Sequence, residues 1–238
     1  IGSYIGLKFF LRRTLGGCEF GVCFDFNIET INDNNLNDKT PLMIASENGF
    51  PEIFQILLNY KDTEICEGAF LNCKSLKQIK IPSTKDYIGK DAFKNCSSLS
   101  QVTISSSIMR IESGAFEGCS LLTGIQIPST ISKIESDVFN RCSSLKEMKI
   151  PSSVSRIESS AFHQCSSLKE IEIPSSVTYI DSNAFSGCSS IIKILIPFSV
   201  TYIGESAFKD CESLKEISIP SSITIIQNST FEGCSNLK

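Results

Sequence analysis

The chain has 238 residues, of which 41% are hydrophobic and 20% are charged, a composition typical of a folded protein with an apolar core. Its 22 basic and 26 acidic residues give a formal net charge of -4, so no overall positive field would attract nucleic acid or an anionic membrane. No run of residues approaches the roughly 20 consecutive apolar residues that a membrane-spanning helix needs. We therefore expect neither a nucleic-acid partner nor a membrane-spanning segment in this sequence.

The first 60 residues do not share the pattern of the rest of the chain. Residues 1–26 have no assigned fold, although residues 8–11 are interpreted as the end of a helix. Residues 27–60 resemble part of an ankyrin repeat, because residues 40–42 (Thr-Pro-Leu) stand where that family begins its first helix and residues 56–58 (Ile-Leu-Leu) match its second. A single ankyrin unit cannot bury its own apolar face. We expect it to form a small helical cap on the segment that follows.

From residue 61 to residue 238 the sequence repeats every 23 residues. Cysteine recurs at this interval from Cys73 to Cys234, and a phenylalanine precedes each cysteine by three residues. After each cysteine comes the pattern Leu-x-x-Ile-x-Ile or a close variant, in which alternate side chains point inward and outward as they do in a β-strand. A proline usually follows and ends the strand. Each repeat is therefore predicted to contribute one strand.

The rest of each repeat supplies the return path of a coil. A Ser-Ser turn leads into a second short extended segment, such as the one that carries Val154 and Ile157. The spacing of Phe and Cys at the last corner suits one helical turn with both side chains inward. Because one such coil cannot bury its faces alone, neighbouring coils must stack. The predicted fold is a leucine-rich-repeat solenoid, a right-handed coil of parallel β-strands with short helical turns.

This pattern resembles the BspA-like class of leucine-rich repeats. Residues 145–165 match the consensus of that class, Leu-x-x-Leu-x-Leu-Pro-x-x-Leu-x-x-Ile-x-x-x-Ala-Phe-x-x-Cys, nearly residue for residue. The repeats stop in the middle of a unit at Lys238, so we expect the natural protein to continue. The resemblance implies a surface or secreted protein of an adhesin-like kind, which binds host cell-surface or matrix proteins. An intracellular ankyrin and leucine-rich-repeat scaffold in the cytoplasm is the alternative.

The residues offer little material for catalysis. Stacked coils would bring equivalent cysteines roughly 5 Å apart, which suits disulfides or metal sites, but their apolar neighbours favour buried, reduced thiols. No Cys-x-x-Cys pair or Cys/His cluster has metal-ligand spacing. His163 is the only histidine, stands at a variable position interpreted as solvated surface, and has no partner for acid–base chemistry. We expect no enzymatic activity, no cofactor and no bound metal.

A basic row and an acidic row recur fourteen and sixteen residues after successive cysteines. Since both rows lie on one face of an extended segment, we expect their charges to compensate one another. Tyr179 and Tyr202 continue the basic row as an aromatic pair and are a candidate binding site. The charged residues of these rows are Arg110, Lys133 and Arg156, and Glu112, Glu135, Glu158 and Asp181.

The sixth strand breaks the polar pattern of the outward-facing positions. Leu195 and Phe198 replace polar residues there, and Ile192 stands at the rim of the strand beside Lys193. Exposed apolar clusters with a polar rim often mark interaction sites, whereas random drift in a redundant repeat is the alternative. We expect these four residues to contact a partner protein or, in self-association, a second copy of the chain.

Overall fold

The structure is a computed structural model that describes residues 7–15, 18–26, 55, 58–59 and 64–238. Strands β1 (Leu7–Leu15) and β2 (Cys18–Phe26) pair antiparallel in a hairpin. The interpretation of residues 8–11 as the end of a helix is therefore wrong, and the phenylalanines of both strands agree with a strand instead. The ankyrin-like repeat falls mainly on residues outside the described ones and stays a prediction. Within the described part of the chain, no helix is long and apolar enough to span a membrane.

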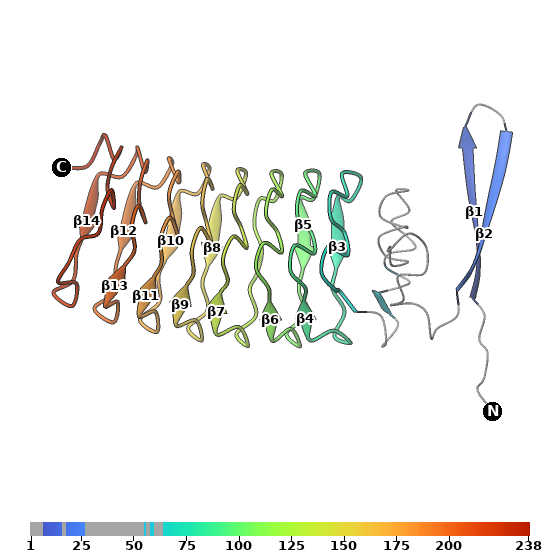
Figure 1. Cartoon of the computed structure of the whole chain (residues 1–238), viewed down its shortest axis with the longest axis horizontal. Helices are drawn as coiled ribbons and strands as arrows, with labels where there is room; N and C mark the ends of the chain where they lie inside the picture. The colour runs from blue at the N-terminus through green and yellow to red at the C-terminus, as the bar shows by residue number, and fades with distance from the viewer. Residues whose placement is uncertain (1–6, 16–17, 27–54, 56–57, 60–63) are drawn as a thin grey trace.

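Residues 64–238 form a parallel β-solenoid whose coils stack along one axis, which confirms the predicted fold class (Figure 1). One set of strands, called the front row, follows the Leu-x-x-Ile-x-Ile pattern. A second set of two-residue strands, called the back row, lies on the opposite side of the coils. The front row comprises β3 (Gln78–Lys80), β5 (Gln101–Thr103), β8 (Glu147–Lys149), β10 (Glu170–Glu172), β12 (Lys193–Leu195) and β14 (Glu216–Ser218). The back row comprises β4 (Tyr87–Ile88), β6 (Arg110–Ile111), β7 (Lys133–Ile134), β9 (Arg156–Ile157), β11 (Tyr179–Ile180) and β13 (Tyr202–Ile203).

Strand pairing follows the 23-residue register in both rows. Ile171 of β10 lies opposite Met148 of β8, and Ile180 of β11 lies opposite Ile157 of β9. In the third coil the expected front strand is reduced to one isolated bridge, between Val102 and Ile125. Gly124 precedes this bridge, and glycine weakens a strand because it has no side chain to pack and loses more backbone entropy.

The core is a set of side-chain ladders along the solenoid axis. The phenylalanines from Phe70 to Phe208 are fully buried, and the ring centroids of neighbouring coils lie 4.9 to 5.9 Å apart. Each cysteine from Cys96 onward donates its thiol hydrogen to the carbonyl oxygen of a phenylalanine 26 residues earlier; Cys165 Sγ, for example, lies 3.1 Å from Phe139 O. The inward positions predicted for Phe and Cys are confirmed. Each thiol is a second donor to a carbonyl that already accepts a backbone N–H, as Phe139 O accepts that of Cys142 at 3.0 Å.

The corner that carries Phe and Cys consists of successive turns instead of a helical turn. Ser160 and Gln164 both have left-handed backbone conformations, with φ of 56° and 58°, and each coil repeats this pair four residues apart. Between these two residues, successive backbone N–H groups bond alternately to their own coil and to the next coil. His163 N bonds Ser160 O within its own coil at 3.0 Å, whereas Phe162 N bonds Ala184 O of the next coil at 2.8 Å. An α-helix keeps such bonds within itself, so it could not connect neighbouring coils in this way.

Two described residues of the predicted cap contact the first coil. Gln55 Nε2 donates a hydrogen bond to Lys80 O at 3.1 Å, and Leu58 is fully buried in the same core as the ladders. Lys80 O belongs to β3, the first strand of the front row, whose outer edge needs a partner. The capping role of residues 27–60 stays a prediction.

Candidate protein-binding surface

An exposed apolar group lies on the front row at β12. Ile192, Leu195 and Phe198 have 50%, 63% and 80% of their surface exposed. The alternation of β12 explains the placement of Leu195, because Lys193 and Leu195 point outward while Ile194 between them is buried. Ser218 stands opposite Leu195 in the next coil. The structure therefore places the predicted residues on one exposed face.

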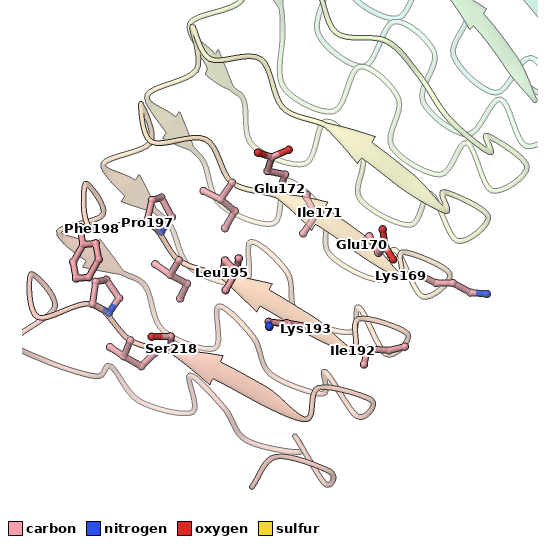
Figure 2. Close-up of a pocket in the computed structure, with 14 residues that line it drawn as sticks. Lys169, Glu170, Ile171, Glu172, Ile192, Lys193, Leu195, Pro197, Phe198 and Ser218 are labelled. Carbon is pink, nitrogen blue, oxygen red and sulfur yellow. The ribbon is translucent and has the colours of Figure 1, made fainter.

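These side chains line a groove of about 780 Å³ between β10 and β14, called here the β12 groove. Figure 2 shows Ile192, Lys193 and Leu195 following one another along β12, with Pro197 and Phe198 beyond the end of the strand. The volume of the β12 groove lies within the range usual for ligand sites in proteins. Its walls come from three neighbouring coils, so a partner would touch residues up to 51 positions apart in sequence, such as Lys169 and Pro220.

The charges around the β12 groove balance one another. Three lysines and three glutamates surround the apolar side chains, and Lys193 of β12 lies in register with Glu216 of β14. Glu172 of β10 is likewise in register with Lys149 of β8. A rim of this kind offers no net field to a charged polymer. The six residues are Lys169, Glu170, Glu172, Lys193, Lys215 and Glu216.

Backbone pairing is interrupted beneath the groove. β10 pairs with β8 and β12 pairs with β14, but β10 and β12 belong to separate sheets. At equivalent positions Lys169 N bonds Lys146 O at 3.1 Å and Lys215 N bonds Ile192 O at 3.0 Å; no corresponding backbone bond joins Ile192 to Lys169 in these described coils. The groove reaches down to inward-facing residues at this interruption, among them Ile171, Ile173 and Ile196. Nothing in the repeat pattern indicated this interruption.

The predicted tyrosine pair lies on a different surface, the back row. The rings of Tyr179 and Tyr202 stack with centroids 4.6 Å apart and planes 10° apart. The guanidinium of Arg156 covers the other face of Tyr179, 3.9 Å from the ring centroid. Partial burial, and then the charge of Asp181, raise the pKa of the Tyr179 phenol. Because both faces of the Tyr179 ring are occupied, only its edge and hydroxyl remain for a ligand, and neither tyrosine lines the β12 groove.

The compensation expected between the basic and acidic rows is confirmed. Arg110 pairs with Glu112, Lys133 Nζ lies 2.8 Å from Glu135 Oε1, and Arg156 Nε lies 2.9 Å from Glu158 Oε1. The three cations are 44% to 72% exposed, so each pair contributes little to stability. These residues form neutral pairs and present no continuous basic stripe.

Groups with chemical reactivity are sparse in the described part of the chain. No cluster of His, Cys, Asp and Glu there could hold a metal ion. Burial raises the pKa of the ladder thiols from Cys96 to Cys234, that of Cys188 to about 12, which makes them weak nucleophiles. His163 is half-buried and its Nδ1 is buried without a hydrogen-bond partner, so the interpretation of a solvated surface position is wrong. The corner turns place this side chain partly within the coil, and the equivalent residue of the next coil, Ser186, is also buried.

Comparisons with known proteins support the same family throughout the solenoid. The family model described as the BspA type leucine rich repeat region matches residues 50–165 and 111–238. No curated protein matches the chain.

Several solved structures resemble this one, among them three bacterial leucine-rich repeat proteins. The leucine-rich repeat protein of T. pallidum is 30% identical with a TM-score of 0.59, over 63% of this chain and 71% of that one. Those of Bacteroides ovatus and Eubacterium ventriosum are 28% and 29% identical, with TM-scores of 0.54 and 0.59, over 72% and 66% of this chain. The chain spans 56% and 42% of these last two proteins, which is less than two thirds of their length. Since the family model covers well over half of its residues, the chain belongs to the BspA-type leucine-rich-repeat family.

Proposed function

We propose that the chain is a non-enzymatic binding protein that holds partner proteins on its front row, at the β12 groove. The exposure of Ile192, Leu195 and Phe198 in one groove carries this proposal. Burial of each such side chain is worth roughly 1.5–3 kcal/mol, part of which a partner recovers by covering it. Neighbouring coils have Glu or Ser at positions equivalent to Leu195 and Phe198, so the repeat itself does not require apolar residues there.

The proposal extends to location and partner. Membership in the BspA-type family supports a surface or secreted, adhesin-like protein whose partners are host cell-surface or matrix proteins. The second candidate is an intracellular scaffold, which the free state of the nine cysteines in residues 64–238 favours, because thiols persist in reducing compartments. Buried thiols with a raised pKa also resist oxidation outside the cell. The free thiols therefore support an intracellular location less strongly than family membership supports a surface or secreted one.

The experiment compares two double variants of the native chain. Leu195→Ser with Phe198→Ser gives the groove the residue that equivalent positions carry in neighbouring coils, Ser218 and Ser221. Met109→Ser with Leu121→Ser makes the same chemical change at exposed positions away from the groove. Binding of each fluorescently labelled protein to cultured host cells and to the matrix that they deposit is measured beside its melting temperature.

We expect the groove variant to keep its melting temperature and to lose binding, while the control variant keeps both. Binding of the groove variant at the native level would show that the partner site lies elsewhere and that the apolar residues are drift. Unfolding of the groove variant at a much lower temperature would show that its two side chains serve the core, which contradicts the proposal.

A further inference from the structure

We infer that the occupant of the β12 groove is an extended, largely apolar polypeptide segment of low net charge, contributed by another protein. This inference rests on the proposed function and specifies the partner's chemistry. Three properties of the groove support it: its shape, the missing strand ladder at its floor and the arrangement of its charges.

The shape favours an extended segment over a helix. The groove follows β12 (Lys193–Leu195) and continues from Ile192 at one end to Phe198 in the turn beyond the other, a length of at most about 20 Å. Across the strands, β10 and β14 are separated by two inter-strand spacings, about 10 Å, and Leu195 projects from the middle. An α-helix with its side chains is about 10–12 Å wide, so no unobstructed trough of that width is present. A strand-like segment of about seven residues can lie beside Leu195 along the full length of the groove.

The floor favours a polypeptide over a hydrocarbon chain. In the described coils no strand ladder joins β10 to β12, so their facing edges lack the ladder hydrogen bonds that join β8 to β10 and β12 to β14. A lipid tail would exclude water from the backbone groups of these edges without replacing its hydrogen bonds, which is unfavourable. A peptide combines apolar side chains for Leu195 and Phe198 with amide and hydroxyl groups for the floor. A peptide segment therefore matches the chemistry of the groove better than a lipid tail does.

The charges disfavour a second copy of this chain as the occupant. Two-fold contacts are the commonest way in which identical chains pair. If two front rows met with their strands parallel, Glu170 of one copy would face Glu216 of the other. If they met antiparallel about an axis along the solenoid, Glu172 would face its own equivalent. Like charges placed opposite one another are destabilising, so a different protein with few charges fits better.

A displayed library of random segments about ten residues long, enough to span the groove when extended, tests this inference. The library is selected on the native chain and counter-selected on the Leu195→Ser, Phe198→Ser variant. We expect enriched segments with apolar residues at alternating positions and low net charge. They should bind the native chain and the Met109→Ser, Leu121→Ser control equally, and the groove variant at least about tenfold more weakly. Methylation of main-chain amides in an enriched segment should weaken its binding.

Three results would overturn the inference. Enriched segments with apolar residues at helical spacing, or with a high net charge, would assign the groove a different occupant and leave the proposed function intact. Failure to enrich any groove-dependent segment, while host-cell binding is still lost in the groove variant, would have the same meaning. A native dimer in sedimentation velocity that the groove variant abolishes would assign the groove to a second copy. Failure of the proposed function itself is distinct, because host-cell binding would then survive in the groove variant.

Discussion

Substitution of Phe162 by alanine tests the stacking of the coils. The Phe162 ring is fully buried and lies between two others, 5.5 Å from Phe139 and 5.3 Å from Phe185. Truncation of a buried aromatic side chain usually costs about 3–5 kcal/mol through lost burial and the cavity left behind. Both stacked neighbours lose a partner here, so we expect a value in the upper part of that range. Domains are typically stable by about 5–15 kcal/mol, which makes this loss large.

Urea unfolding of the native chain and of Phe162→Ala measures the loss. The control is Phe198→Ala, the same change at a side chain that is 80% exposed, for which we expect a change within about 0.5 kcal/mol. A loss below about 1 kcal/mol for Phe162→Ala, or equal losses for both variants, would refute the assignment of the corner to the core. Because solenoids can unfold in parts, the slope against urea should also be compared between the proteins.

Three further predictions concern the core and the backbone. The ladder thiols should resist a thiol reagent in the native chain and react after denaturation; full labelling of the native chain would contradict their burial. Burial raises the pKa of Cys188 from 9.0 to about 12, so its thiol ionises in the unfolded chain first, and the stability that it contributes is lost as pH rises above about 9. At about pH 10, the free energy of unfolding should have fallen from its value at neutral pH by about 1.4 kcal/mol more in the native chain than in Cys188→Ala. Equal falls in the two proteins would argue against burial of this thiol. Gly204→Ala should destabilise the solenoid by about 1–3 kcal/mol, because a Cβ there would lie 2.4 Å from Ser182 N, whereas Gly124→Ala, with no atom within 4 Å, should be nearly neutral; equal urea midpoints would refute this close approach.

The periodic part of the fold could be predicted from the sequence because each position recurs in many coils. The 23-residue interval alone assigns Phe162 and Cys165 to the core and Leu195 to the outer face, and the structure agrees. The same reasoning paired Arg156 with Glu158 across two residues of one extended segment. In each case the side-chain direction follows from strand alternation or from repetition of the register.

The remaining features depend on backbone geometry that residue types do not reveal. The corner has a helix-like spacing of Phe and Cys, yet residues as different as Ser160, Gln164 and Arg141 adopt left-handed conformations there, because hydrogen bonds to the next coil compensate. The front row likewise falls into three separate two-stranded sheets, so its pairing is interrupted between β10 and β12 and also before β8. Sequence reasoning found the apolar side chains of the groove but missed its floor.

Hydrogen–deuterium exchange of the native chain, with and without a bound segment from the groove-selected library or a matrix protein to which it adheres, tests the location of the binding site most directly. The account predicts that binding slows exchange in residues 169–173 and 192–198, on the front row. The back-row strands β9, β11 and β13 should exchange at unchanged rates. Protection confined to the back row around Tyr179 and Tyr202, with no change along β10 and β12, would contradict it.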